Sequence, residues 1–267
     1  QQKQIRVSGM VHHKNLIVEM HGPVAVVTVN RPERRNSIHP QLDTSTVGQD
    51  ESPPKGTKVF VLTGTGDHFC AGLDLEEHAR LKRTPAEFMR MCQKWHWAFD
   101  QMQFGGTPVI GALHGAVVGG GMELAAACHT RIADTTTFFA LPEGQRAIFT
   151  GGGATVRVGR IIGASRMVDM MLAARTFDVE RGYELGLCHE IVDKGKALER
   201  AIALAHQVSE HAPLSNYAIV TSISRINDMS TTDGLFAESL MAAVVQSGPE
   251  VAAGLDNFLS KKAKRLK

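Results

Sequence analysis

Short apolar runs separated by turn residues dominate the N-terminal part of the chain, a pattern that predicts β-strands. Residues 16–20 and 24–30 flank a His-Gly-Pro turn and predict a hairpin. Residues 59–63 and Val109–Leu113 are uninterrupted apolar runs, which are typical of strands buried on both faces. The predicted strands are therefore residues 16–20, 24–30, 59–63, 109–113, pieces of 131–140, and 189–193.

Helical periodicity appears between these strands. Thr84, Pro85 and Glu87 combine a capping hydroxyl, a first-turn proline and an acid at the third position, which predicts a helix N-terminus. The apolar residues that follow recur at three- and four-residue spacing: Phe88, Met91, Trp95, Phe99 and Met102. Such a stripe more often belongs to a core than to a pocket wall, although an apolar ligand would need such a wall. Further helices are predicted at 154–162, 165–174 and 179–187.

The character of the chain changes near residue 197, after which the periodicity is helical only. Helices are predicted at 198–211, 214–226, 231–246 and 250–260. Their apolar residues exceed what a peripheral appendage needs, and we expect them to pack against another subunit: Met229, Leu235, Phe236, Leu240 and Met241. The pattern predicts an α/β fold with a core at 1–196 and a helical region at 197–267.

Composition narrows the function classes. The 267 residues are 43% hydrophobic and 21% charged, with a formal net charge of +2, which is typical of a soluble globular protein and gives no strong case for nucleic-acid binding. Apolar runs are too short to span a membrane. The four cysteines show no C-x-x-C pair, which favours reduced thiols and argues against disulfides or a metal site. We expect a cytoplasmic protein, or a mitochondrial matrix protein in a eukaryote.

A glycine turn after the strand Val109–Leu113 is the first candidate for chemistry. Gly119, Gly120 and Gly121 leave the backbone open, so that N–H groups at the start of the next helix can approach a ligand. The positive end of the helix favours negative charge there, and Glu123 lies in the first turn. This arrangement predicts an oxyanion hole beside a carboxylate. The alternative is close helix–strand packing, with Glu123 complementing the helix dipole.

The spacing of these glycines fits neither of the common phosphate-binding loops. It is not G-x-G-x-x-G, and no acidic residue follows a clear strand where a ribose would need it. The chain also has no G-x-x-x-x-G-K-[ST] motif.

Two further loops carry candidate residues. Gly72 precedes a backbone N–H, that of Leu73, which can face a ligand. Asp74 could react, but an Asp beside a glycine turn more often binds nearby backbone, which we favour. Glu143 follows Pro142, whose fixed backbone can hold a carboxylate pointing inward. By itself, Glu143 would be interpreted as an exposed loop residue.

Three motifs together resemble the crotonase family, the enoyl-CoA hydratase/isomerase superfamily. They are Phe69-Cys-Ala-Gly-Leu-Asp-Leu75, Gly119-Gly-Gly-Met-Glu123, and Leu141-Pro-Glu143 with the later Gly151-Gly-Gly153. The likeness covers most of residues 14–260. It implies a spiral of ββα units, a C-terminal helical region that builds homotrimers or hexamers, an acyl-CoA thioester as substrate, and no metal or redox cofactor.

The resemblance also implies roles for particular residues. The backbone N–H groups of Leu73 and Gly120 would stabilise a thioester enolate, at roughly 3–4 kcal/mol per donor. Glu123 would mainly orient and deprotonate water, and Glu143 would protonate Cα, although two carboxylates sharing a water titrate as a coupled pair. The remaining implied substrate or CoA contacts are Arg34, Arg35, Ala71, Gly72, Asp74 and Gly119, with the CoA phosphates near the basic tail at 261–267 of a neighbouring subunit.

Possession of both acids favours hydration or dehydration, because isomerases similar in fold keep only one. Hydroxycinnamoyl-CoA hydratase-lyases use a C-terminal tyrosine, and Phe236 falls near its place here, which weakens that alternative. A third alternative, a noncatalytic or RNA-binding relative, is disfavoured by the intact carboxylates and by the absence of a basic stripe.

Departures from the family pattern concern the acyl pocket more than the chemistry. His129 stands where an Asp is common, Phe149 and Thr150 replace small or proline residues, and the segment after Asn36 lacks the expected helix. Residues 39–56 are rich in breakers, and we expect irregular structure there.

Overall fold

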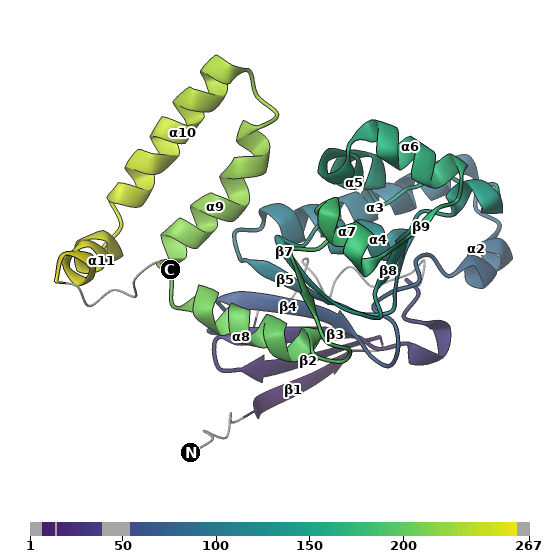
Figure 1. The fold of residues 1–267 in the computed structure, drawn as a ribbon, viewed down its shortest axis with the longest axis horizontal. Coiled ribbons are helices and arrows are strands. Elements are labelled where there is room, and N and C mark those ends of the chain that lie inside the picture. The colour runs from purple at the N-terminus through teal and green to yellow at the C-terminus, as the bar shows by residue number, and fades with distance from the viewer. Residues whose placement is uncertain (1–6, 14, 39–53, 261–267) are drawn as a thin grey trace.

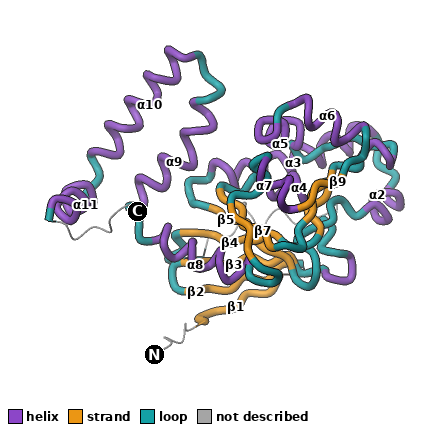
Figure 2. The backbone as a smooth tube through the Cα atoms, in the orientation of Figure 1, coloured by secondary structure: helices purple, strands orange, loops and turns teal. Residues whose placement is uncertain are grey.

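The computed structural model describes residues 7–13, 15–38 and 54–260 (Figure 1). Most of the segment predicted to be irregular, and the basic tail at 261–267, lie outside these residues. The α/β fold class predicted from the sequence is confirmed, since a twisted sheet lies among helices in the order that the apolar runs indicated (Figures 1 and 2).

The large sheet has seven strands in the order β1-β2-β3-β4-β5-β7-β10. Its first three strands are antiparallel, and the strands from β3 to β10 pair in parallel. The strands are β1 (Val7–His13), β2 (Leu16–His21), β3 (Val24–Val29), β4 (Val59–Gly64), β5 (Val109–Leu113), β7 (Thr130–Asp134) and β10 (Glu190–Val192). Parallel strands that are covered on both faces read as continuous apolar runs, which explains the patterns of β4 and β5.

A second sheet has three strands in the order β6-β8-β9 and positions the two loops that lead into Glu123 and Glu143. Its strands are β6 (Ala116–Val118), β8 (Phe138–Ala140) and β9 (Thr176–Asp178). β6 and β8 are parallel, and each leads directly into a candidate loop: the glycine turn follows β6 and the Pro142 turn follows β8. Neighbouring parallel strands end at the same edge, so this small sheet brings the two loops together.

Helices form the layers over the sheets. They are α2 (Leu75–Leu81), α3 (Pro85–Phe104), α4 (Gly120–Ala126), α5 (Ala154–Ile162), α6 (Ala164–Leu172), α7 (Val179–Glu184), α8 (Ala197–Ser209), α9 (Pro213–Ile226), α10 (Thr231–Gln246) and α11 (Glu250–Leu259), with short 3-10 turns η1 (Pro32–Arg34) and η2 (Glu143–Arg146). The largest core cluster unites the buried stripe of α3, at Met91, Trp95 and Phe99, with α4 and α5.

The predicted start of α3 is confirmed in detail. Thr84 caps the helix, with its hydroxyl accepting from the Glu87 N–H and the Glu87 side chain accepting from the Thr84 N–H. Pro85 occupies the first turn. This capping box fixes where α3 begins and therefore which of its residues face the core.

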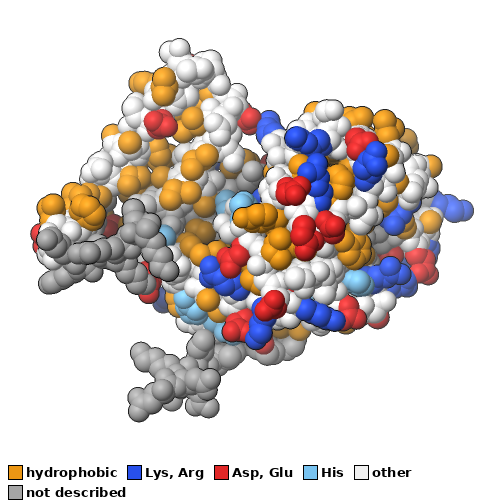
Figure 3. Space-filling model, in the orientation of Figure 1, with side chains coloured by type: hydrophobic (Ala, Val, Ile, Leu, Met, Phe, Trp, Pro, Cys, Tyr) orange, Lys and Arg blue, Asp and Glu red, His pale blue; other side chains and the backbone are white. Residues whose placement is uncertain are grey.

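The C-terminal helices divide into two kinds. Ala197, Ala201 and Ala205 of α8 pack on the large sheet in a second core cluster with strand valines. The start of the predicted 197–267 region is therefore attached to the sheet, whereas α9, α10 and α11 project away from it (Figure 1). Exposed apolar side chains gather over these projecting helices (Figure 3).

Four of the strands and α-helices were not predicted. β1 pairs with β2 at the edge of the large sheet, β6 lies between β5 and the glycine turn, α2 follows Asp74, and β9 completes the small sheet. β1 and β9 carry little apolar periodicity of their own, and tertiary pairing rather than local sequence makes them strands.

Candidate active site

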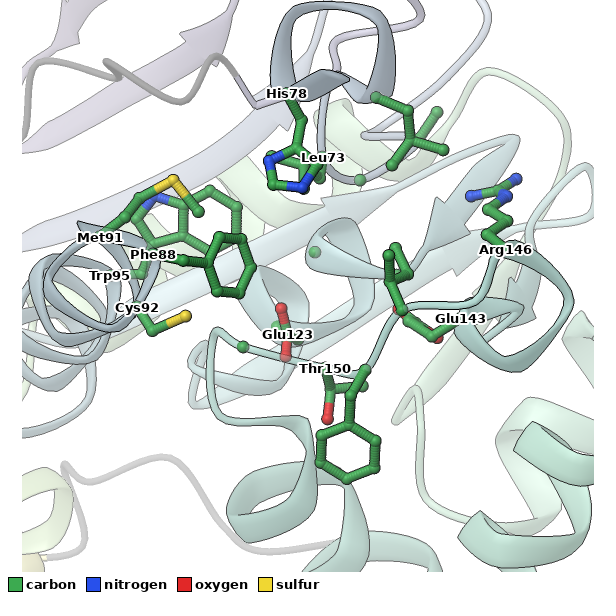
Figure 4. Close-up of a pocket in the computed structure, with 18 residues that line it drawn as sticks. Leu73, His78, Phe88, Met91, Cys92, Trp95, Glu123, Glu143, Arg146 and Thr150 are labelled. Atoms are coloured by element: carbon green, nitrogen blue, oxygen red, sulfur yellow. The ribbon is translucent and has the colours of Figure 1, made fainter. Parts of the chain in front are cut away.

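A pocket opens where the glycine turn, the Pro142 turn and the helices α2 and α3 meet (Figure 4). Its lining includes seven of the ten residues predicted from the sequence: Ala71, Gly72, Leu73, Gly119, Gly120, Glu123 and Glu143. The three others, Arg34, Arg35 and Asp74, are not among its lining residues. Apolar side chains of α3 form one wall, with Phe88, Met91 and Trp95 on the same side of the view (Figure 4).

Glu123 is a buried carboxylate held by backbone donors. Only 2% of the residue is exposed. One oxygen, Oε1, accepts hydrogen bonds from the Gly152 N–H at 2.8 Å and from the Ala154 N–H at 3.1 Å. Burial raises the pKa of Glu123, and these two backbone donors act against that rise. The glycines at 151–153 therefore orient Glu123 and help to keep it ionised.

Glu143 begins the turn η2 and lines the same pocket. It is buried, and its Oε2 has no hydrogen-bond partner within the described part of the chain. Burial, and to a lesser extent the charge of Glu123, raises the pKa of Glu143 to about 7. Near neutral pH this carboxyl is therefore partly protonated, which suits a group that donates and accepts a proton.

The glycine turn brings two backbone N–H groups close together. Gly119 precedes α4 with φ of 54° and Gly72 has φ of 93°, both in the left-handed region. A Cβ at Gly72 would lie 2.7 Å from the Val118 carbonyl oxygen and 3.1 Å from the Gly120 nitrogen. Only glycine allows this approach. Among the described residues, neither the Leu73 N–H nor the Gly120 N–H donates to another protein group.

The structure gives Asp74 a role in the fold. Its Oδ1 caps α2 by accepting from the Glu77 N–H at 3.2 Å, and its Oδ2 is 3.0 Å from the Arg31 guanidinium. The backbone-binding alternative is therefore the one observed. The signal was present in the sequence, because an Asp with acids two and three positions later, here Glu76 and Glu77, is typical of a helix start.

Arg34 and Arg35 lie on the surface beyond the pocket. The Arg34 guanidinium forms an ion pair with Glu76, which raises its pKa. The carbonyl of Arg35 accepts from the Ala71 N–H at 3.0 Å, which ties this turn to the pocket loop.

His96 and His129 are not among the residues that line the pocket. His96 is exposed on α3. His129 connects two elements, since its Nδ1 accepts from the Val109 N–H and its Nε2 lies 2.9 Å from the Gln103 carbonyl oxygen. The departure from the family pattern at His129 therefore concerns the anchoring of β5 to the end of α3.

Two polar residues near the pocket, His78 and Arg157, escaped sequence reasoning, and Thr150 was noted only as a departure from the family pattern. His78 and Thr150 line the pocket, and each has a buried polar atom without a hydrogen-bond partner within the described ranges. Arg157 of α5 is buried, and its Nη1 donates to the carbonyl oxygen of Gly152 at 3.3 Å. The N–H of the same glycine donates to Glu123. An arginine among the apolar residues of the predicted helix 154–162 was the available signal for Arg157.

The described residues contain free thiols, but no metal-binding cluster and no helix suited to span a membrane. Within 7–13, 15–38 and 54–260, no group of three or more His, Cys, Asp or Glu side chains is arranged to hold a metal ion. No helix in that part of the chain is both long and apolar enough to cross a membrane. Cys70, Cys128 and Cys188 are buried free thiols, and burial raises the pKa of Cys70 to about 12.

Together, the fold and the pocket define a class: α/β proteins in which two loops of a small sheet place paired carboxylates beside unpaired backbone donors. The sequence pattern of the enoyl-CoA hydratase/isomerase family matches residues 19–267. The chain belongs to this family.

Individual relatives agree with that assignment. The chain is similar to the 2,3-dehydroadipyl-CoA hydratase of Escherichia coli, with 29% identity over 94% of this chain and 98% of the relative. Among solved structures, a Rhodopseudomonas palustris protein proposed to be an enoyl-CoA hydratase is 38% identical, with a TM-score of 0.87 over 96% of this chain and 98% of the other. The enoyl-CoA hydratase of Bacillus anthracis is 27% identical, with a TM-score of 0.83 over 93% and 97%.

Proposed function

We propose that the protein is an enoyl-CoA hydratase, which adds water across the 2,3 double bond of an acyl-CoA thioester or removes it. The observation that carries the proposal is the presence of two buried carboxylates, Glu123 and Glu143, in one pocket. Hydration needs one group to activate water and another to manage the proton at Cα, so a pair of acid/base groups fits this reaction.

The thioester oxygen would bind the N–H groups of Leu73 and Gly120. Negative charge develops on that oxygen when water attacks the double bond, and preorganised donors in a site with little water stabilise it. The close approach of Gly72 to Gly120 supports this placement, as does the absence of another acceptor for either N–H among the described residues.

The two carboxyl groups would divide the proton transfers. Glu123 would orient water and take its proton, because two backbone donors favour its ionised form. The water oxygen then bonds to C3, and the electron pair of the double bond moves toward C2 and the thioester. Glu143, with a pKa of about 7, would deliver the proton to C2. The proton gained by Glu123 returns to solvent or to its partner, which restores the pair.

The CoA moiety would leave the pocket past Ala71, with Arg34 and Arg35 as proposed contacts on the adjoining surface. The chemistry assigned here needs no metal and no redox cofactor, since every step is a proton transfer or an addition. We expect no nucleic-acid or membrane partner.

The projecting helices would form the interface of a homotrimer or a hexamer. Large apolar side chains are exposed on them, among which Leu235 is 62% exposed, Phe236 65% and Phe258 71%. Apolar surface gathered on one part of a molecule is typical of a subunit interface. This supports the packing against another subunit that the apolar pattern predicts, and the family resemblance implies the trimer or hexamer.

Product analysis in ¹⁸O-labelled water tests the reaction assignment. A hydratase yields a 3-hydroxyacyl-CoA with solvent oxygen at C3 and an intact acyl chain. Isomerisation would move the double bond without incorporating oxygen, and a hydratase-lyase would shorten the chain. Either of these outcomes would replace the hydratase assignment while leaving the enolate site in place.

A further inference from the structure

His78 interrupts an otherwise apolar wall of the pocket. The other lining residues of α2 and α3 are Leu75, Phe88, Met91, Cys92 and Trp95. His78, Phe88, Met91 and Trp95 lie toward one side of the pocket, and Glu143 and Arg146 lie toward the other (Figure 4). The side formed by α2 and α3 is therefore the place for the part of an acyl group that lies beyond the reacting atoms.

The imidazole of His78 is fixed and incompletely hydrogen-bonded. It packs edge-on against the Phe88 ring, with centroids 5.2 Å apart and an interplanar angle of 62°. Its Nδ1 is buried and has no hydrogen-bond partner in the described part of the chain. Burial, and then the positive charge of Arg83, lowers the pKa of His78, so the ring is neutral near pH 7. A neutral imidazole offers one donor and one acceptor.

Arg83 adds a second unsatisfied group beside this ring. It lies in the connection between α2 and α3, where its charge acts on His78. Its Nη1 is buried and, like His78 Nδ1, lacks a partner within the described ranges. Buried polar atoms are normally hydrogen-bonded, and an exception at a pocket wall indicates a group that the ligand or a water satisfies. His78 Nδ1 can donate to an oxygen acceptor in the pocket when it carries the ring proton, and the positive charge of Arg83, which acts on the same ring from outside the pocket lining, favours such an acceptor.

We propose that the pocket selects acyl groups that carry an oxygen acceptor, a carboxylate or a carbonyl, beyond the reacting double bond. His78 is the specificity-determining residue, and Arg83 supplies positive charge behind it. The proposal rests on the proposed function in that the ligand is an acyl-CoA thioester. It goes beyond that function by naming the class of acyl group.

Calorimetric titration with saturated acyl-CoA thioesters tests the proposal without requiring turnover. Three ligands of equal chain length end in a methyl, a methyl ester or a carboxylate. The parent protein is expected to bind at least one oxygen-bearing ligand about 10-fold or more tightly than the methyl-ended ligand. Preference for the carboxylate alone identifies an anionic acyl group, and equal preference for the ester identifies a neutral acceptor.

Variants assign the preference to residues. His78→Met should remove it for both oxygen-bearing ligands while binding of the methyl-ended ligand is retained or improved. Arg83→Met should reduce only the carboxylate preference. Arg80→Met serves as the control, because Arg80 is an exposed residue of the same helix, 75% accessible, and pairs with Glu77 at the surface.

Two results would overturn the proposal: a parent protein that binds the methyl-ended ligand as tightly as the others at every chain length, or an unchanged ratio of affinities in His78→Met. The ratio is internal to each variant, so a partial loss of folded protein does not affect it. Hydration assays with methyl-ended enoyl-CoA thioesters report on the proposed function separately, since either result can occur without the other.

Discussion

Substitution of Arg157 tests whether the loop at residues 151–153 positions the Glu123 carboxylate. The Arg157 guanidinium reaches the Gly152 carbonyl oxygen at 3.3 Å, the Gln103 Oε1 at 2.8 Å and the Asp100 Oδ1 at 2.5 Å. The Gly152 N–H in turn donates to Glu123. The substitution Arg157→Met keeps an unbranched apolar stem and removes all three hydrogen bonds.

The magnitude follows from these contacts. Three hydrogen bonds at about 1 kcal/mol each give a loss in the free energy of unfolding of roughly 2–3 kcal/mol, of which the bond to half-exposed Asp100 contributes least. For catalysis, a loosened donor pair at Glu123 should lower kcat roughly 10- to 100-fold, which corresponds to about 1.4–2.7 kcal/mol in the barrier.

The pH profile separates a positioning role from a structural one. Arg157 and the loop N–H groups all lower the pKa of Glu123. When the charge is removed, that pKa rises, a larger fraction of Glu123 is protonated at low pH, and the acid limb of the kcat profile moves to higher pH. Arg157→Lys should restore part of this shift, because it returns the charge.

Steady-state kinetics and urea unfolding on the parent, Arg157→Met and Arg157→Lys provide the readouts. Arg160→Met is the matched control on the same helix, where Arg160 is exposed and pairs with Asp228 at the surface. If Arg157→Met lowers stability but keeps the parent kcat and acid limb, the argument for positioning is refuted.

Three further outcomes are expected. Because burial raises the pKa of Glu143 from 4.5 to about 7, the stability that this carboxyl contributes is full below pH 4.5 and is lost as pH rises through 7. Glu143→Gln should therefore exceed the parent in the free energy of urea unfolding by roughly 3 kcal/mol at pH 8, and not at pH 4. Asp74→Ala should lower stability by about 1–2 kcal/mol through loss of the α2 cap and the partner of Arg31, and parent-like thermal unfolding would contradict that role. Phe236→Asp with Leu240→Asp should reduce the molecular mass measured by light scattering to that of a monomer, whereas an unchanged oligomer would place the interface elsewhere.

The sequence indicated the parts of the site that local chemistry determines. The glycine turn before Glu123 and the proline before Glu143 could be recognised because each imposes a backbone geometry at its own position. The strands β4 and β5 and the start of α3 were predictable for the same reason, since apolar runs and capping residues act locally.

The rest depends on contacts between distant residues. The Gly152 N–H that donates to the Glu123 carboxylate lies 29 residues further along the chain, and no spacing rule predicts this hydrogen bond. The capping role of Asp74 is local, but its ion pair joins it to Arg31, 43 residues away, which no local pattern predicts. His78 follows a motif that the family resemblance covered, yet its place in the pocket wall became evident only when α2, itself unpredicted, packed beside α3.

The central claim is that two carboxylates act together on one acyl-CoA thioester. The most direct measurement is the loss of the conjugated-thioester absorbance when the purified protein is mixed with a panel of 2-enoyl-CoA esters, together with Glu123→Gln and Glu143→Gln. The account predicts that the parent consumes at least one ester, and that each variant is slower by roughly 100-fold or more while it still binds a saturated acyl-CoA. Near-normal turnover in either variant, or a folded parent that binds the thioesters and consumes none, would contradict it.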